Sequence, residues 1–339
     1  MSSPHTFVPP RSDRAFTLIE VIVASAVLAL ILMLLLSITD ITSRTWRGTT
    51  DKMQAFDGAR AAFDQITTTL SQAVLNTYWD YDDLAAPTKY ERRSELQFLS
   101  LPMKDFGLSA TDYPTHGIFF QAPTGTVSNK STHGNLPLVL NAFGYFVEYG
   151  DDSFDKPSFV DGLTGTVQPR YRFRLKQWKV PAEQFTLYEK SSGVTGRNFL
   201  GAQTLDWIDL DNPHARPLAE NIIALVVYPK NTESVNSNST SLTSDFFYNS
   251  RDRTNAQRFH QLPPEVEVIM VAIDEASATR VFQNSASAPN LTNGLFSSAN
   301  GPQIEADLQA LSKKLTNDGV QFIVLRTTVK IRGARWSES

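Results

Sequence analysis

The sequence predicts an α+β protein in which one long N-terminal helix precedes an antiparallel β-sheet. An uncharged apolar run begins near the N-terminus, and helical spacing continues after it with no proline between Phe16 and Ala86. From about Pro87 onward, short segments alternate apolar and polar residues. The first pattern is typical of a helix with one buried face. The second is typical of strands in a sheet with one covered face.

The composition is that of a folded chain with one large domain. The chain has 339 residues, of which 41% are hydrophobic, and this is enough for a packed core. The formal net charge is −4, so a nucleic-acid ligand held by bulk electrostatics is not expected. The absence of cysteine excludes disulfides, thiol catalysis and Cys-ligated zinc, and it leaves the compartment open.

The apolar run Phe16–Ile38 has the length of a transmembrane helix. No charge occurs in Val21–Thr39, and about 20 apolar residues at 1.5 Å rise cover the roughly 30 Å hydrocarbon core of a bilayer. Residues 1–15 are polar and rich in proline, so we expect them to be unstructured. Arg11 and Arg14 precede the run, which predicts a cytoplasmic N-terminus and an exported remainder.

Glu20 distinguishes between three interpretations of this run. A secretory signal has a shorter apolar region followed by a small-residue cleavage site, and residues 37–46 (SITDITSRTW) contain no convincing site of that kind. A plain signal anchor accounts for the length of the run but not for an ionisable side chain within it. Such a group costs a few kcal/mol on insertion scales and is by default functional. We therefore expect Glu20 to meet a partner in an assembled state.

The residues Ala15–Val21 (AFTLIEV) resemble the processing site of type IV pilins and pseudopilins, in which F-T-L-I-E follows a small residue. The resemblance implies that a prepilin peptidase cuts between Ala15 and Phe16 and methylates the new amine of Phe16. Glu20 then becomes the fifth residue and serves assembly. The family nearly always has glycine before the cut. Alanine is the smallest replacement, so cleavage is still expected here.

The implied partners are the prepilin peptidase, other pilin or pseudopilin subunits and the inner membrane. The implied location is a single pass through the inner membrane, with a cytoplasmic leader (residues 1–15), a transmembrane segment (residues 16–38) and a periplasmic head. An envelope-spanning filament is the alternative location for the assembled subunit.

After Ile38 the helix is predicted to continue in amphipathic form over residues 39–78. Its apolar residues recur at spacings that place them on one helix face. They are Trp46, Met53, Phe56, Phe63, Ile66, Leu70 and Val74. We interpret this stripe as core packing against the sheet. Gly48 and Gly58 each weaken the helix by about 1 kcal/mol relative to alanine, so a bend is expected near them.

The head, residues 79–339, is predicted to contain a sheet and one further helix. The predicted strands are Glu95–Leu101, Gly117–Ala122, Leu138–Tyr149, Arg170–Trp178, Gln184–Lys190, Asn221–Tyr228, Glu265–Ile273 and Val320–Ile331. After Pro302, a helix is predicted whose apolar face consists of Ile304, Leu308, Leu311 and Leu315. The segments at about 231–255 and 283–300 are rich in Asn and Ser and lack the periodicity needed for burial, so we interpret them as loop insertions.

One predicted strand invites a functional interpretation. In Arg170–Trp178, Tyr171 and Phe173 alternate with Arg172 and Arg174. Such a strip can stack single-stranded nucleic acid. The acidic net charge favours an ordinary exposed sheet face instead.

The sequence contains no recognisable catalytic, cofactor-binding or metal-binding pattern. The histidines are scattered: His5, His116, His133, His214 and His260. The acidic groups Asp82–Asp83, Asp151–Asp152 and Asp209/Asp211 lack the spacing of a calcium loop, so we interpret them as solvated turns. We therefore expect a protein that is not an enzyme and that has no cofactor and no metal.

The order of elements resembles the ladle-shaped pilin architecture, and the size of the head resembles the J-type minor pseudopilins of type II secretion. Leu262–Arg280 and the ending VLRTTVKIRGARW also resemble the Verru_Chthon cassette protein C family. These resemblances imply a minor pilin or pseudopilin in a type II secretion-like or type IV pilus-like filament or tip complex. Two alternatives stay open: a membrane-anchored exported ectodomain with binding or enzymatic activity, and an adhesive or DNA-uptake minor pilin.

Overall fold

The N-terminal helix α1 (Leu18–Ala55) is apolar on all sides over its first part. The computed structural model describes residues 18–83, 85–134, 136, 138–153, 169–187, 207–210, 214–231, 246–252, 254–255, 257–292, 294–297 and 303–335. It divides into two units, Met1–Gln54 and Ala55–Ser339. Every side chain of Leu18–Asp40 is exposed, and this 23-residue stretch is long and apolar enough to cross a membrane. The predicted span begins at Phe16, which lies outside the described residues.

Helix α2 (Asp57–Ser71) belongs to the second unit, the head, and follows a turn at Phe56, close to Gly58. Its buried side chains recur every three or four residues: Ala59, Ala62, Phe63, Ile66 and Leu70. Phe63, Ile66 and Leu70 of the predicted stripe are thereby confirmed as buried, whereas the side chains of Trp46 and Met53 lie outside the described residues. The helix ends at Ser71 and not near residue 78, because the N–H of Val74 donates to the carbonyl oxygen of Gln121 (2.9 Å). That bond leads the chain away from the helix and onto the sheet.

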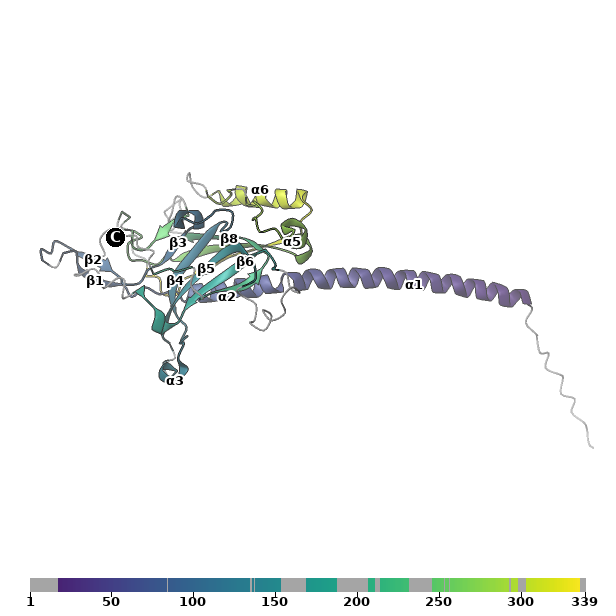
Figure 1. Cartoon of the computed structure of the whole chain (residues 1–339), viewed down its shortest axis with the longest axis horizontal. Coiled ribbons are helices and arrows are strands. Elements are labelled where there is room, and N and C mark those ends of the chain that lie inside the picture. Colours follow the sequence, from purple (N-terminus) through teal and green to yellow (C-terminus); the bar gives the residue numbers. More distant parts are fainter. Residues whose placement is uncertain are drawn as a thin grey trace, which may run out of the picture. The chain divides into compact units, whose positions relative to one another are not determined.

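In the part of the chain that the structure describes, the head contains a six-stranded sheet and a three-stranded sheet (Figure 1). All of their strand pairs are antiparallel. The larger sheet has the order β7 (Ala215–Glu220), β6 (Arg172–Val180), β5 (Leu140–Gly150), β4 (His116–Pro123), β3 (Leu99–Pro102) and β9 (Tyr248–Asn249). The smaller has the order β11 (Phe322–Lys330), β10 (Glu265–Ile273) and β8 (Ile222–Lys230). A separate ribbon consists of β1 (Tyr78–Tyr81) and β2 (Tyr90–Arg93). The predicted α+β class is confirmed.

The larger sheet is covered on both faces, and not on one face as its alternating pattern predicts. In β4, Ile118 and Phe120 join the core cluster that holds α2 and the smaller sheet. Between them, Phe119 points to a second cluster that includes Trp178. A Cβ at Gly144 would lie 2.6 Å from the ring of Phe119, so glycine is required there for this close approach.

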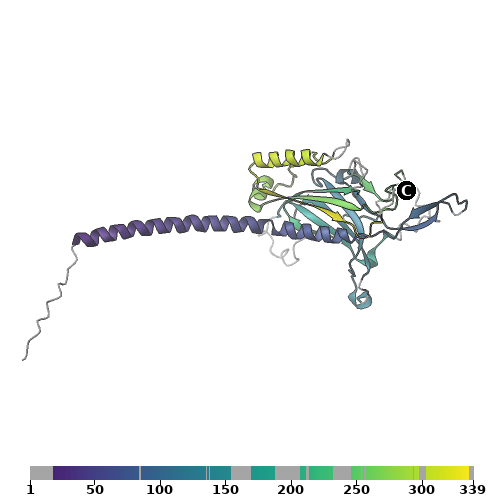
Figure 2. The same ribbon diagram turned by 180° about the vertical axis from the view of Figure 1, so that it is seen from behind.

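Helix α6 (Ile304–Asn317) confirms the predicted C-terminal helix. Its buried residues are the four that the sequence indicates: Ile304, Leu308, Leu311 and Leu315. In both views α6 and α2 lie on opposite sides of the sheets (Figures 1 and 2). Among the described residues, four short helical elements are not predicted: α5 (Glu275–Phe282), α3 (Lys130–His133) and the 3-10 turns η1 (Met103–Phe106) and η3 (Ala182–Gln184).

The predicted strand Gln184–Lys190 is wrong over its described part. Ala182–Gln184 forms a 3-10 turn (η3) after Pro181, and residues 188–190 lie outside the described residues. Leu187 is buried in the second core cluster, and Phe185 packs against that cluster. These alternate apolar residues pack on a face of the sheet without pairing with its strands. Their spacing is the same as that of a strand with one buried face, which explains the wrong prediction.

Both predicted loop insertions contribute to the core where they are described. In the first, Phe246 and Tyr248 are fully buried. In the second, Phe296 and Leu291 are buried. The expectation that these segments lack buried residues is therefore wrong there. Isolated aromatic residues are enough to anchor them, and isolated residues leave no periodic signal.

His116 links the two sheets through its imidazole ring. Its Nδ1 accepts a hydrogen bond from the N–H of Val227 (3.0 Å), so Nε2 carries the proton and donates to the carbonyl oxygen of Phe296 (2.8 Å). Beside it, the hydroxyl of Thr115 accepts from the N–H of Leu225 (3.0 Å). The edge of β8 that faces away from β10 is thereby bonded to β4. Burial lowers the pKa of His116 to about 4.

This lowered pKa predicts an acid-sensitive head. The unfolded state, in which the pKa of a histidine is about 6.5, binds the proton more readily between pH 6.5 and 4. Stability contributed by neutral His116 is therefore present above pH 6.5 and lost as the pH falls towards 4. The expected loss is about 3 kcal/mol, at roughly 1.4 kcal/mol per unit of pKa difference. Urea unfolding measured across this pH range tests it.

The matched control is His116→Gln, which cannot titrate. The variant is expected to be less stable at neutral pH, with a shallower loss of stability between pH 6.5 and 4. Equal slopes for the variant and the wild type would show that His116 is not the source of the acid sensitivity.

Candidate functional site

The candidate functional site is the first part of α1, around Glu20. Glu20 lies in the first turn of the helix and is exposed. Ala24, Val27 and Ile31 follow it at intervals of three or four residues and so lie on the same side of the helix. A shallow hollow on this side is lined by Ile19, Glu20, Val23, Ala24, Val27, Leu28 and Ile31. The helix thus presents a carboxylate within an otherwise apolar surface.

Hydroxyl groups in the apolar segment bond within the helix. Ser25 Oγ donates to the carbonyl oxygen of Ile22 (2.8 Å), and Thr39 Oγ1 donates to that of Leu35 (2.8 Å). These groups are therefore satisfied in a bilayer without any outside partner. The predicted processing residues Ala15 and Phe16 lie outside the described residues.

The acidic groups of the head hold turns together. Asp82 accepts hydrogen bonds from the hydroxyl and the N–H of Thr88, and these bonds hold the pKa of its carboxyl well below the usual range. Asp151 accepts from the N–H of Ser153, and Asp152 accepts from the N–H of Arg170. The interpretation as turns is confirmed for these two groups. Among the described residues, no group of three or more His, Asp or Glu side chains could hold a metal ion.

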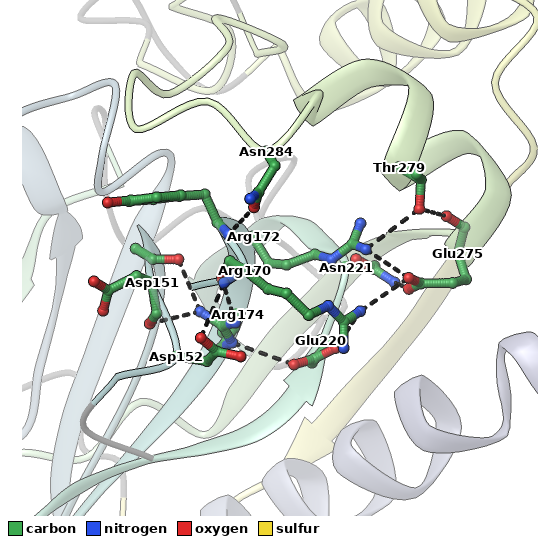
Figure 3. Close-up of polar contacts among 12 residues, drawn as sticks. Asp151, Asp152, Arg170, Arg172, Arg174, Glu220, Asn221, Glu275, Thr279 and Asn284 are labelled. Atoms are coloured by element: carbon green, nitrogen blue, oxygen red, sulfur yellow. Dashed lines mark hydrogen bonds and ion pairs between the residues drawn. The ribbon is translucent and has the colours of Figure 1, made fainter. Parts of the chain in front are cut away.

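A cluster of charged side chains lies at the start of β6 (Figure 3). Arg172 Nη2 pairs with Glu275 on α5 and also bonds Thr279 (3.3 Å). Arg174 Nη1 donates to the carbonyl oxygens of Gly150 (2.8 Å) and Asp151 (2.9 Å). The cluster therefore joins β6 to α5 and to the end of β5.

Both sequence interpretations of this strip are wrong for its arginines. The side chains of Arg172 and Arg174 are 8% and 3% exposed, so they form neither an exposed face nor a stacking surface. Phe173 between them is buried and packs against Phe282 and Tyr149. The alternation correctly indicates a strand. It carries no signal for the acidic partners Glu220 and Glu275, which lie 46 and 103 positions further along the chain.

This arrangement predicts that Glu275→Ala destabilises the head by about 1–3 kcal/mol, because it leaves the buried Arg172 without its carboxylate. The loss is moderated because Glu275 is itself half exposed. Glu265 is the matched control, since it pairs with Lys330, whose side chain is 81% exposed. Glu265→Ala should cost less than about 1 kcal/mol. Urea unfolding measures both, and equal losses would contradict the structural role of Arg172.

Comparison with known proteins identifies the N-terminal segment. Residues 10–36 match the prokaryotic N-terminal methylation motif, which spans Ala15, Phe16, Glu20 and most of the apolar stretch. The match is consistent with the type IV pilin and pseudopilin family. No curated protein and no solved structure matches the chain. The motif supports a pilin-like protein that is processed by a prepilin peptidase, assembles with other pilins and is anchored in a membrane.

Proposed function

We propose that the protein is a minor pilin or pseudopilin that assembles through α1 into a type II secretion-like or type IV pilus-like filament or tip complex. The observation that carries this proposal is Glu20, a carboxylate in the first turn of an exposed apolar helix, inside the methylation motif. A helix that serves only as an anchor gains nothing from such a group. The prepilin peptidase is a partner, and this chain is its substrate.

Processing would give Glu20 its role. A cut between Ala15 and Phe16 creates a positively charged amine on Phe16, about one helical turn from Glu20. In a bundle of such helices, the carboxylate of one subunit meets the amine of its neighbour, and neither charge stays unpaired in a medium of low dielectric constant. Because only one axial stagger allows this pairing, Glu20 sets the register between subunits.

The head supports a place near the end of an assembly. Its main core cluster is formed by residues of the head alone. The side chains of Leu18–Asp40 are exposed and are available to lipid and neighbouring helices. A head of this size packs poorly in a repeating shaft, which favours low copy number near a tip. A pseudopilin of secretion and an adhesive or DNA-uptake minor pilin share this N-terminus, and both fit the proposal.

The mature protein is expected to begin with N-methylated Phe16, fifteen residues shorter than the full chain. Intact mass and N-terminal sequencing after expression with an active prepilin peptidase measure this directly. Ala15→Gly is the matched control and should be cut at least as fast. A chain that keeps residues 1–15 while Ala15→Gly is cut would show that Ala15 blocks processing. Retention in both would favour a membrane-anchored ectodomain.

Replacing Glu20 by valine is expected to leave insertion and cleavage intact, since the substitution removes a costly group and keeps the Ala15–Phe16 bond. Co-purification with partner pilins should fall at least about tenfold, because the amine of the neighbouring subunit loses its counter-ion. Val23→Leu changes the same side of the helix without changing charge and should assemble normally. If Glu20→Val were processed and co-purified like the wild type, the register role would be wrong.

A further inference from the structure

The β1–β2 ribbon has an aromatic face that neither core cluster uses. Its register pairs Trp79 with Arg92 and Tyr81 with Tyr90. Because side chains alternate along each strand, these four residues lie on one face of the ribbon, which we call the aromatic face. In both views the ribbon extends beyond the two larger sheets (Figures 1 and 2).

The rings of the aromatic face are unusually exposed. Trp79 is 61% exposed, Tyr90 60% and Tyr81 40%. The rings of Tyr81 and Tyr90 stack with their centroids 4.5 Å apart, and their hydroxyls are 2.8 Å apart. Arg92 lies over Trp79, 5.9 Å from the ring centroid. The aromatic face thus consists of two stacked pairs, Tyr81 with Tyr90 and Trp79 with Arg92, and polar atoms lie beside the rings of both.

Polar contacts hold this ribbon in shape. Beyond β1, the carboxylate of Asp82 accepts hydrogen bonds from the N–H groups of Thr88 and Lys89, and these bonds stabilise the turn between β1 and β2. Arg93 donates to the carbonyl oxygen of Asp82 (2.8 Å), and Tyr78 donates to Glu95 (2.8 Å). An isolated two-stranded ribbon is marginal in water, so these bonds replace the core that it lacks. In spite of these contacts Trp79 and Tyr90 remain more than half exposed, and exposed apolar patches with polar neighbours mark binding sites.

We propose that the aromatic face binds an uncharged polysaccharide made of β1,4-linked glucose or N-acetylglucosamine. Sugars of this configuration carry their hydroxyls around the ring edge and expose flat C–H faces above and below. The rings of Trp79 and Tyr90 contact such a C–H face. Arg92 and the tyrosine hydroxyls at the edge hydrogen-bond the sugar hydroxyls.

The charge and geometry of the ribbon favour this ligand over three others. Arg92 is the one charged residue of the aromatic face, because Asp80 and Glu91 lie on the opposite face of the ribbon by the same alternation. A single cation is too little for nucleic acid or an anionic lipid surface, both of which are held by several positive charges. A proline-rich peptide needs a groove between separated rings, and here Tyr81 and Tyr90 fill that space by stacking on each other.

The experiment is co-sedimentation of the full-length, detergent-solubilised protein with insoluble cellulose and chitin. Binding to at least one of them is expected, and soluble cello- or chito-oligosaccharides should compete. Trp79→Ala and Tyr90→Ala should each weaken binding about tenfold, as the loss of an anchoring aromatic ring does. Trp79→Phe and Tyr90→Phe keep a ring and should retain most of it. Unchanged urea unfolding would show that the variants fold.

The matched control for non-specific apolar adhesion is Leu138→Ala, since Leu138 is 72% exposed outside the ribbon. It should bind like the wild type. Failure to bind both polysaccharides, or binding that survives Trp79→Ala and Tyr90→Ala, overturns the proposal. Binding to single-stranded DNA or anionic vesicles in place of polysaccharide, lost in the same variants, also overturns it. The inference does not rest on the proposed function, because the aromatic face contains none of the residues proposed for processing or assembly. Trp79→Ala should therefore be processed and assembled normally.

Discussion

The packing of α2 against both sheets is the contact on which the head depends. The stripe on α2 reaches β4 and β7 of the larger sheet and β10 and β11 of the smaller one. Phe63, Ile66 and Leu70 are buried in this contact, and each contributes about 1.5–3 kcal/mol relative to an exposed position. Since α2 follows α1 directly in the chain, the segment that closes the core also joins the head to the apolar helix.

Many charged side chains of the head pair with one another and so stabilise its fold. Besides the arginine cluster of β6, the buried carboxylate of Glu267 pairs with Lys230 and Arg326, and Arg326 also pairs with Glu305 on α6. Removing one partner of such a group is costly, so these clusters fix the relation between the helices and the smaller sheet. Among the described residues, the apolar helix with Glu20 and the aromatic face stand out as exposed surfaces that combine apolar and polar groups.

Elements with a long, regular pattern could be predicted from the sequence, because local spacing alone identifies them. The strands β8, β10 and β11 and the apolar face of α6 are examples. Tertiary contacts decided the rest. Arg172 is buried only because Glu275 comes from a distant helix, and α2 stops where Val74 bonds Gln121. Glu20 could be singled out because a lone charge in an apolar run is visible locally. The sequence does not indicate the β1–β2 ribbon, because YWDY and YERR lack a regular alternation of apolar and polar residues.

Copy number connects the two proposals. A single aromatic face offers three rings, a small contact that limits the affinity of one subunit. Many copies along a shaft would multiply that affinity through avidity, whereas one or two copies at an end would not. The proposed function places a head of this size at an end of the assembly and not along its shaft. Under that proposal, the aromatic face of an end subunit makes brief, repeated contacts with a polysaccharide, while the pairing of Glu20 holds the subunit in the assembly. In these two proposals the head binds polysaccharide weakly, and the N-terminal helix pairs specifically with neighbouring subunits.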